Sequence, residues 1–565
     1  MTLKNKINFE WVINPYNQDI TKTISSKFPD ISPLLIRLLI NRGQLEADNI
    51  NDFLNPSPKI DLPPCIDNDK IAILLKDAIL NQTQITIYGD YDADGITSTA
   101  LLTHFLQTLK ANVNYYLPSR AKEGYGLHTS AIENLAKKGT KILITVDCGI
   151  SNHKEITLAK KLGMTVIVTD HHHISANLPP ADFVINPKIL KTAGLDIMAG
   201  VGVTFQLVKG LGEYFQIPKS CIAKYLDLVT LGTIADIVPL LGVNRNIIKR
   251  GLKYIRESKR MGFKALCDII NIKQEDLNIY NIAFQFTPRL NASGRMADAS
   301  TALSLLLTQD INTANTLAET LNKLNQARQK LCNEIFEDAQ RMMADIDLIN
   351  DKVIVLAQQG WKDGVIGIVA SKLVEMYYKP VFLIALEGDR GRGSARSTGN
   401  FNIFKALGFS SDYLEKFGGH QGAGGLSIKK ENIPMFKNTI AKYADENLTK
   451  EDLIPSVKID MPLNFDSISF KLLEEIALLE PFGNGNPCPV FASYKVKVTD
   501  QKTSRDGKHL LFRVEENNRA YKAVLWNKGQ LYPLPSFVDI AYSLETNSFQ
   551  GETSIQLNIL DVKEA

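Results

Sequence analysis

The sequence predicts a multidomain α/β protein that ends in a small all-β domain. In the first half, short apolar segments suited to buried strands alternate with helical patterns, which is typical of a parallel sheet with helices on both faces. The 565 residues exceed what one hydrophobic core supports, so we expect several domains. Hydrophobic residues at 44% and charged residues at 22% are ordinary values for a folded protein.

The predicted parallel sheet lies in a unit that spans residues 66–230. Five apolar segments, each followed by a turn, are its expected strands: QITIYGD, ANVNYYLP, KILITVDCG, MTVIVTDHH and ADFVINP. Before this unit, residues 1–65 mix short helical pieces with the proline-rich stretch NPSPKIDLPP. Because prolines end regular structure, we interpret residues 1–65 as an N-terminal arm or linker.

Three further parts are expected after this unit. Residues 231–345 have helical periodicity and end in TANTLAETLNKLNQARQKLCNEIFEDAQRMMADI, which is long enough for one connecting helix. A second α/β domain at 346–450 contains the apolar strands KVIVLAQQG and PVFLIALEG. Residues 451–565 alternate apolar and polar positions over five segments, which suits a five-stranded barrel of the OB type.

Composition and charge exclude several classes of protein. The 64 basic and 61 acidic residues leave a net charge of +3, so a nucleic-acid site would have to be a local groove. The six cysteines form no C-x-x-C pair, which argues against a zinc cage or a disulfide framework and favours a reducing cytoplasm. The chain begins without an apolar signal segment and no apolar stretch reaches 18 residues, so we expect neither secretion nor membrane insertion.

Acidic and imidazole side chains directly follow three of the predicted strands. Asp90, Asp92 and Asp94 follow the first strand, Asp147 follows the third, and Asp170, His171, His172 and His173 follow the fourth. Because ligands collect outside the carboxyl ends of strands in open α/β sheets, these side chains should meet in one crevice. Neighbouring carboxylates raise the cost of ionising one another, and a bound cation would offset that cost.

Carboxylates combined with imidazoles suit Mn²⁺, Zn²⁺, Co²⁺ or Fe better than Ca²⁺, and their number suits two ions about 3.5 to 4 Å apart. An EF-hand would need a glutamate where Leu101 stands and a helix where a strand is expected. A haloacid-dehalogenase-type phosphatase shares D-x-D-G but would leave the histidines without a role. For each motif alone, a helix N-cap or a solvated loop is the alternative interpretation.

The motifs resemble, in order, those of the DHH phosphoesterase superfamily: GDYDADGITSTAL, VDCGIS, VTDHHH and DLVTLGTIADIVPL. FTPRLNASGR, GSARS, GGHQGAGG and LLEPFGNGNPCPVF extend the resemblance, over nearly the whole chain, to the RecJ family of that superfamily. The resemblance implies a DHH catalytic domain, a DHHA1 domain at 346–450 and an OB-fold domain. It also implies a 5′-to-3′ exonuclease specific for single-stranded DNA, which uses Mn²⁺ or Mg²⁺, releases 5′-mononucleotides and serves recombination and repair.

The resemblance also implies the roles of individual residues. The metal ligands would be Asp90, Asp92, Asp94, Asp147, His171, His172 and Asp236. The catalytic residues would be Asp92, Asp94, Asp147, His171, His172 and His420. Asp227 is a further candidate for this set, with a helix cap or an ion pair to Lys224 as the alternative interpretation. For His173, a supporting or merely exposed position is the alternative.

A 5′ exonuclease must hold a terminal phosphate, and arginine suits this task because its planar fork binds phosphate oxygens in pairs. Arg396 and Ser394, which we expect in a glycine-rich loop, are the predicted anchor, with Arg120 helping. The remaining predicted substrate contacts are Arg289, Asn291 and Arg295 in the cleft between the α/β units, and Gly419 and His420 at the scissile phosphate. Simple solvation of the arginine-rich segment is the alternative.

In the OB-type domain, cationic side chains and one aromatic ring would give affinity without sequence preference. The candidates are Lys495, Lys497, Lys502, Arg505, Lys508, Arg513 and Trp526. Lys362 and Asp363 stand where many relatives have His and Pro, which puts one local contact in doubt. The resemblance implies a monomer that acts with a single-strand-binding protein and a RecQ-type helicase. A phosphodiesterase for short oligonucleotides or cyclic dinucleotides, and a non-catalytic repair scaffold, are the competing functions.

Overall fold

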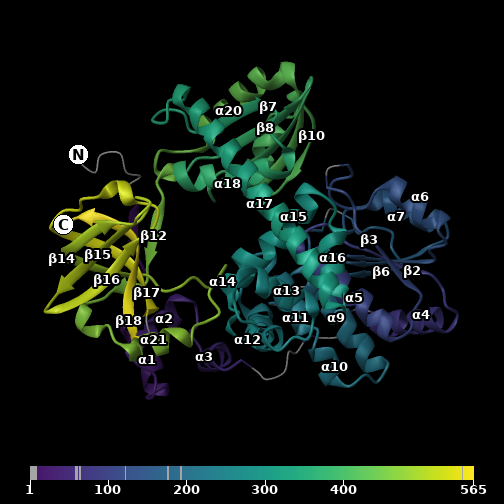
Figure 1. Ribbon diagram of the computed structural model, residues 1–565, viewed down its shortest axis with the longest axis horizontal. Helices are drawn as coiled ribbons and strands as arrows, with labels where there is room; N and C mark the ends of the chain where they lie inside the picture. The colour runs from purple at the N-terminus through teal and green to yellow at the C-terminus, as the bar shows by residue number, and fades with distance from the viewer. Residues whose placement is uncertain are drawn as a thin grey trace.

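Three folded units and a group of helices make up the protein (Figure 1). The computed structural model describes residues 9–56, 62, 65, 67–120, 122–174, 177–190, 194–549 and 552–565. In Figure 1 the first α/β unit lies on the right, the second at the top and the barrel on the left. Most of the proline-rich stretch at 55–64 lies outside the described residues. The predicted fold class is confirmed.

The first unit is built on a five-stranded parallel sheet in the order β3-β2-β4-β5-β6. All five predicted segments form strands: β2 (Ile85–Tyr88), β3 (Val113–Tyr116), β4 (Ile142–Val146), β5 (Thr165–Thr169) and β6 (Phe183–Ile185). The chain runs from β2 outward to β3 and then returns to the other side of β2. The order therefore reverses between β2 and β4, the point where such sheets bind ligands.

Helices cover both faces of this sheet, as predicted. One face packs on α4 (Asn68–Leu80), α5 (Ala93–Thr108), α9 (Gly200–Tyr214) and α11 (Leu226–Ala235). The other packs on α6 (Thr129–Lys137) and α7 (His153–Lys161). The short helices α8 (Pro187–Leu190) and α10 (Lys219–Ala223) complete the unit. The boundary that we placed between residues 230 and 231 falls inside α11, because that helix shares the core of the sheet.

The helical region continues the same hydrophobic core rather than forming a separate one. Its helices are α12 (Gly242–Arg256), α13 (Met261–Ile270), α14 (Ile279–Asn281), a π-helical turn η2 (Ile282–Phe286), α15 (Thr287–Met296) and α16 (Ser300–Leu307). The predicted connecting helix is α17 (Ile311–Met342). Its first half packs in the core of the first unit and its last turns pack in that of the second. This helix therefore acts as a strut between the two units.

The second unit has a mixed sheet in the order β10-β11-β9-β8-β7. Its elements are β7 (Ile354–Gln359), α18 (Asp363–Tyr377), β8 (Val381–Glu387), β9 (Arg390–Arg396), α19 (Ile403–Phe409), β10 (Leu414–Gly419), β11 (Ala423–Lys429) and α20 (Ile433–Asn447). Our expectation that Ser394 and Arg396 lie in a glycine-rich loop is wrong, because β9 is an interior strand between β8 and β11. A side chain at Gly393 would overlap Leu426 of β11, so close packing explains the glycine there.

The C-terminal unit is a closed barrel of five strands, as expected for an OB-type domain. The strands are β14 (Phe491–Thr503), β15 (Leu510–Glu516), β16 (Arg519–Leu525), β17 (Phe537–Phe549) and β18 (Glu552–Glu564). Pairing of β14 with both β15 and β17 closes the barrel. The elements β12 (Ser456–Ile459), β13 (Met461–Pro462) and α21 (Phe470–Ala477) precede it.

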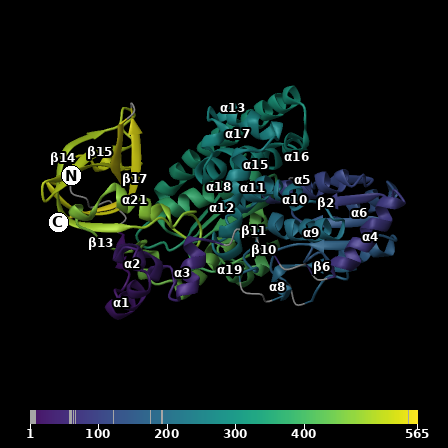
Figure 2. The same ribbon diagram turned by 90° about the horizontal axis from the view of Figure 1, so that it is seen from below.

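The N-terminal segment, which we interpreted as an arm or linker, folds onto the barrel. It contains β1 (Glu10–Ile13), α1 (Gln18–Lys27), α2 (Pro33–Asn41) and α3 (Ala47–Leu54). Strand β1 pairs in parallel with β12, and the three helices share the core of the barrel. Figure 2 shows these three helices and the barrel at the same end of the molecule. The partner strand β12 lies more than 400 residues after β1 in the sequence, so local patterns could not reveal the pairing.

A buried arginine joins the helical region to this N-terminal and C-terminal assembly. Arg245 of α12 donates to the carbonyl oxygens of Phe53, Leu478 and Leu479, at 2.9 to 3.2 Å. These carbonyls end helices α3 and α21, where the backbone oxygens lack partners within the helix. Its guanidinium also lies 3.8 Å from the centre of the Phe53 ring. One cation therefore ties three segments together.

Among the described residues, no helix is long and apolar enough to cross a membrane. All six cysteines are free thiols, in agreement with the argument against a disulfide framework.

We predict that Arg245→Ala lowers the free energy of unfolding by about 2 to 4 kcal/mol, because three carbonyl groups lose a charged donor in a buried place. Guanidinium-induced unfolding measures this change. Lys253→Ala, at an exposed position of the same helix, is the control and should shift the free energy by less than about 0.5 kcal/mol. Equal destabilisation by the two substitutions would contradict the proposed joint.

Candidate metal centre and adjoining cavity

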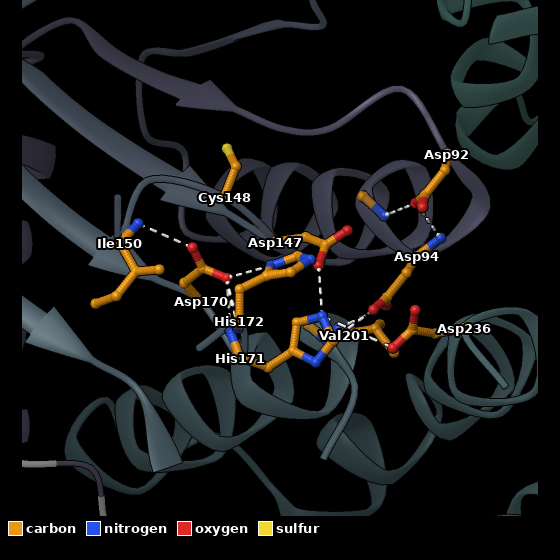
Figure 3. A network of polar contacts seen from close by, with 12 residues as sticks. Asp92, Asp94, Asp147, Cys148, Ile150, Asp170, His171, His172, Val201 and Asp236 are labelled. Atoms are coloured by element: carbon orange, nitrogen blue, oxygen red, sulfur yellow. Dashed lines mark hydrogen bonds and ion pairs between the residues drawn. The ribbon is translucent and has the colours of Figure 1, made fainter. Parts of the chain in front are cut away.

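Loops at the carboxyl ends of β2, β4 and β5 meet beside the point where the strand order reverses (Figure 3). Asp92 is the N-cap of α5, and its side chain accepts hydrogen bonds from the backbone N–H groups of Asp94 and Gly95, both at 3.0 Å. The N-cap interpretation of this aspartate is therefore correct. It does not exclude a metal, because a carboxylate has more acceptor sites than these two bonds use.

Asp94 joins the start of α5 to the start of α9. Its carboxylate accepts from the backbone N–H groups of Gly200 at 2.7 Å and Val201 at 2.8 Å. A side chain at Gly200 would lie 2.4 Å from Oδ1 of Asp147, so only glycine permits this approach. The two helix starts thus hold the carboxylates of the first two motifs against each other.

His171 lies at the centre of the cluster. Its Nε2 is 3.2 Å from Oδ1 of Asp147 and 3.7 Å from Oδ2 of Asp236, which follows α11 (Figure 3). Three sets of side chains bring ligand atoms within 4.8 Å of one another: Asp147, His171 and His172; Asp94, His171 and Asp236; Asp90, Asp92 and Asp147. All seven predicted metal ligands therefore belong to this cluster.

The donor atoms of the cluster fit divalent cations. Oδ1 of Asp90, Oδ1 of Asp147 and Nε2 of His171 are buried and accept or donate no hydrogen bond within the described part of the chain. Buried polar atoms normally have partners, because an unpaired one is costly. Asp147 also holds a left-handed backbone conformation with φ of +61°. Backbone strain and buried ligand atoms without hydrogen bonds at one point are what a site completed by bound ions would show.

The electrostatics of the cluster point the same way. Burial, together with the charges of neighbouring aspartates, raises the pKa values of Asp90, Asp94 and Asp147 well above their usual range. Burial and the nearby Asp92 raise the pKa of Asp236 to about 7. Two like charges 4 Å apart repel by about 4 kcal/mol near a protein surface. Without cations, the protein therefore holds these carboxylates at a cost.

His171 is ready to act as a ligand because it stays neutral. Burial and the proximity of His172 lower the pKa of His171 to about 3. A neutral imidazole has a free lone pair, which is the form that binds divalent metals.

Asp170 orients the neighbouring histidine. It accepts from the backbone N–H groups of Ile150, His171 and His172, and its Oδ1 lies 2.7 Å from Nδ1 of His172. Burial alone would raise the pKa of Asp170, but the hydrogen bonds from His172 outweigh it and lower that pKa. An ionised Asp170 only accepts, so Nδ1 of His172 donates to it. Burial would lower the pKa of His172, but the hydrogen bond and charge of Asp170 outweigh it and raise that pKa. When the ring is neutral, Nε2 has the free lone pair.

The sequence reasoning missed Tyr125, whose hydroxyl lies 2.9 Å from Nδ1 of His172 and 3.4 Å from the carbonyl oxygen of Asp147. It comes from the loop before α6, and no sequence pattern singled it out. Lys188 is a second such residue, since its ammonium group contacts the carbonyl oxygen of His171. Both hold the backbone or the ring of a predicted ligand.

A cavity of about 330 Å³ lies between the two α/β units. Of the predicted substrate residues, Arg120, Arg295 and Ser394 line it. Arg295 is held by a hydrogen bond of 3.0 Å to the carbonyl oxygen of Gly364 in α18, and Arg120 lies over the ring of Tyr91. Burial and the other arginines lower the pKa of Arg295 to about 10, so it remains a cation. The cavity therefore offers a concentrated positive charge beside the metal cluster.

Two predicted residues support the cavity or the neighbouring loop without lining the cavity themselves. Arg396 is half-buried and donates to Oγ of Ser394 at 3.1 Å, but it is not among the residues that line the cavity. Asn291 accepts a hydrogen bond of 2.8 Å from the backbone N–H of Ala93, so it supports the loop that carries Asp92. Asp363, at the position that departs from many relatives, lines the cavity and pairs with Arg392 at 3.0 Å.

Arg289 does not line the cavity, contrary to our expectation. Its guanidinium donates to Asn322 of α17 at 3.1 Å and to the carbonyl oxygen of Gln285. Arg295 lies six positions after Arg289, and this spacing turns the two side chains to different sides of the helix.

Asp227 lies outside the metal cluster. It pairs with Arg260 at 2.9 Å and with Oγ of Ser258 at 2.7 Å, rather than with Lys224. It stands in the first turn of α11 and Asp236 follows the last, so the length of the helix separates them.

The tip of the β10–β11 hairpin brings the second unit to the metal cluster. The rings of His420 in that tip and His173 of the first unit are 5.8 Å apart. Burial and the nearby His173 lower the pKa of His420, so it is neutral near pH 7. Gly419 has φ of +141°, and a side chain there would meet the carbonyl oxygen of Ala423 at 2.3 Å. The tight hairpin thus depends on glycine.

Several of the cationic candidates in the barrel have acidic neighbours. Those within 4.0 Å of a carboxylate are Lys497, Lys508 and Arg513. Such exposed pairs exchange easily and contribute little to stability. Trp526 is half exposed and lies against the ring of His509, which leaves a surface for stacking on a base.

Models of three protein families match the chain: the DHH family N-terminal domain over residues 84–233, the DHHA1 domain over 350–446 and the RecJ OB domain over 459–561. Six of the seven cluster residues lie in the first of these matches, while Asp236 lies three positions beyond its end. The His420 hairpin lies in the second.

Individual proteins match over nearly the full length. The single-stranded-DNA-specific exonuclease RecJ of Bacillus subtilis is 36% identical over 561 residues, which cover 98% of this chain and 70% of that protein. The crystal structure of RecJ from Thermus thermophilus in complex with Mn²⁺ matches with a TM-score of 0.86 and 30% identity, over 98% of this chain and 80% of the other. Its complex with Mg²⁺ matches with a TM-score of 0.81 and 28% identity, over 98% and 78%.

We predict that Mn²⁺ raises the melting temperature more at about pH 8 than at about pH 5. In the folded metal-free protein the pKa of Asp236 is about 7, above its usual 3.8. The protonated form is therefore favoured by folding, and this stability is lost as the pH rises through 7. Bound cations would remove the loss because they pair with the ionised carboxylates.

Thermal unfolding with and without saturating Mn²⁺ at both pH values measures this effect. Asp236→Asn is the control, because without an ionisable group at 236 the pH dependence of the metal-free protein should become flatter. The same Mn²⁺ effect at both pH values would contradict the prediction.

Proposed function

The chain belongs to the RecJ family of single-stranded-DNA-specific exonucleases, and from that premise we propose that it degrades single-stranded DNA from the 5′ end and releases 5′-mononucleotides. The observation that carries this proposal is that the arginine-lined cavity adjoins the metal cluster: Tyr91, which lies between the cluster residues Asp90 and Asp92 in the chain, lines the cavity. A nuclease needs a group that binds one end of the strand and a centre that hydrolyses the adjoining phosphodiester.

Two Mn²⁺ or Mg²⁺ ions would be held by the cluster of Asp90, Asp92, Asp94, Asp147, His171, His172 and Asp236. When bound, such ions activate a water molecule and neutralise charge on the phosphoryl oxygens. The buried atoms of Asp90, Asp147 and His171 that make no hydrogen bond within the described part of the chain support this assignment. Asp170 contributes by keeping the proton of His172 on Nδ1, so that Nε2 faces the cluster as an acceptor.

His420 acts from the opposite side of the site. A neutral imidazole still has one N–H group, and we assign it the role of donor to a non-bridging oxygen of the scissile phosphate. The backbone at Gly419 can approach the substrate closely because no side chain intervenes. The short distance between His420 and His173 supports this placement.

The cavity gives the enzyme its polarity. Arg120 and Arg295 line it with Ser394, and we assign them to the terminal 5′-phosphate, since guanidinium groups bind phosphate oxygens in pairs. Arg396 supports the pocket from behind through its bond to Ser394. Arg295 also carries its charge close to Asp92, so the same side chain links the terminal phosphate to the hydrolytic centre.

The barrel argues against the competing functions. A phosphodiesterase for short oligonucleotides or cyclic dinucleotides has no need of an additional domain that binds an extended strand, and the RecJ OB domain matches 459–561 here. A non-catalytic scaffold has no need of a complete set of ligands. We further propose that the protein works as a cytoplasmic monomer, on strands supplied by a RecQ-type helicase and covered by a single-strand-binding protein.

Digestion of single-stranded DNA labelled at either end tests the proposed function. With Mn²⁺, a 5′ label should appear at once as mononucleotide, while a 3′ label should remain on progressively shorter strands. Duplex DNA with blunt ends should resist. Release of the 3′ label first, or cleavage without any divalent cation, would overturn the proposal.

Asp147→Ala and His171→Ala should each lower Mn²⁺-dependent release of mononucleotides by at least about a thousandfold, because loss of a ligand removes several kcal/mol of transition-state stabilisation. Binding of single-stranded DNA, measured by fluorescence anisotropy without metal, should remain largely intact. If binding fell as much as cleavage did, a purely catalytic role for these residues would be wrong.

Arg396→Ala should reduce the preference for a 5′-phosphate over a 5′-hydroxyl end by about tenfold to a hundredfold, because Ser394 loses its half-buried charged partner. Competition between the two kinds of strand in one digestion measures the preference. Arg390→Ala is a matched control on the same strand, since Arg390 is exposed and pairs with Glu415 outside the cavity. An unchanged preference in the Arg396 variant would remove this residue from the pocket.

A further inference from the structure

The residue after the metal-cluster aspartate Asp236 has an unusual conformation. Ile237 has φ of +57°, which lies in the left-handed region. The residue is 71% exposed. Consecutive Cα atoms are 3.8 Å apart, so this exposed apolar group stands at the edge of the cluster.

Both features are unfavourable for an isoleucine. A β-branched residue with positive φ is a genuine outlier, because its side chain crowds the backbone. An apolar side chain that stays exposed to water contributes none of the stabilising free energy that burial would give. Such strain persists only where the surrounding structure imposes it, and it gathers at functional sites. Glycine would adopt this conformation without strain. We therefore look for a function that depends on the isoleucine side chain.

The surrounding segment imposes this conformation. Val238 and Leu240 pack into the core of the first unit, whereas Ile237 belongs to none of the hydrophobic clusters found among the described residues. The chain therefore turns its next apolar side chains inward and leaves Ile237 outside.

A loop from the C-terminal unit holds the backbone of this segment. Nδ2 of Asn484 donates to the carbonyl oxygen of Ile237 at 2.7 Å, and the carbonyl oxygen of Asn484 accepts from the N–H of Leu240 at 2.8 Å. Gly485 lies against Pro239: a Cβ atom added at Gly485 would lie 3.1 Å from Cβ of Pro239. This loop is part of the motif LLEPFGNGNPCPVF, which neither the metal cluster nor the cavity uses. It fixes the main chain at 237 and leaves the side chain free.

We propose that Ile237 packs against a nucleobase of the single strand engaged at the metal cluster, and that Asn484 holds it in position. This inference rests on the proposed function. The occupant of this place is DNA, because a phosphodiester bound at the cluster brings its bases within reach of the neighbouring residue. The face of a base is flat and apolar, and every base has one. An aliphatic side chain at this point thus adds affinity without sequence preference.

The variant Ile237→Gly tests this role, because it should lower the activity without lowering the stability of the fold. Glycine accepts the left-handed conformation, so the melting temperature should not fall. Mn²⁺ binding by calorimetry should not change, because Asp236 keeps its place. The value of kcat/KM on single-stranded DNA should fall about tenfold, mainly through KM, since one apolar contact is lost. Ile237→Leu, which keeps the apolar side chain, should retain activity.

Strands with one abasic residue, moved stepwise from the 5′ end, identify the contact. The wild-type protein should lose about tenfold at one position of the abasic residue, whereas Ile237→Gly should cleave that strand and the intact strand equally well. Full activity of Ile237→Gly, or the same abasic penalty in both proteins, would overturn the inference while the proposed function stands. If the wild-type protein neither bound nor cleaved single-stranded DNA, both would fail.

Discussion

Uncompensated negative charge at one edge of the first sheet is the constraint on which the rest of the structure depends. Three aspartates, Asp94, Asp147 and Asp236, lie close to the neutral ring of His171, and Asp90 and Asp92 adjoin Asp147. One oxygen each of Asp90 and Asp147 is buried without a hydrogen-bond partner among the described residues. Protonation can relieve this repulsion, but a protonated carboxyl group no longer serves as a metal ligand. Two divalent cations would relieve the repulsion and keep the carboxylates as ligands. Asp170 on His172, the starts of α5 and α9 on Asp92 and Asp94, and Tyr125 beside Asp147 all hold this arrangement in place.

The second constraint is that the cluster must work together with groups from elsewhere in the chain. The helix α17 packs in the cores of both α/β units and therefore fixes the distance between them. As a result, the β10–β11 hairpin brings His420 to His173, and Arg295 and Ser394 from different units line one cavity. The C-terminal unit is joined to the same body by the hydrogen bonds of Arg245 and of the Asn484 loop.

Much of this could be predicted from the sequence, because strands and loops near the site obey local rules. Apolar segments with polar residues at their ends located β2, β4 and β5, and the geometry of parallel sheets placed their loops together. The errors share one cause, which is that tertiary contacts decide what local patterns leave open. The segment RGRGSAR is polar and rich in glycine, yet β9 forms because strands pair with it on both sides. Arg289 and Arg295 differ only in the side of the helix they occupy, and the N-terminal segment depends on β12, far along the chain.

The most direct test of the central claim is anomalous X-ray scattering from a crystal of the protein soaked in Mn²⁺. Two manganese peaks about 3.5 to 4 Å apart, bounded by Asp90, Asp94, Asp147, His171 and Asp236, are the predicted result. A map without peaks among these side chains, measured at a Mn²⁺ concentration that supports release of nucleotides, would contradict the account.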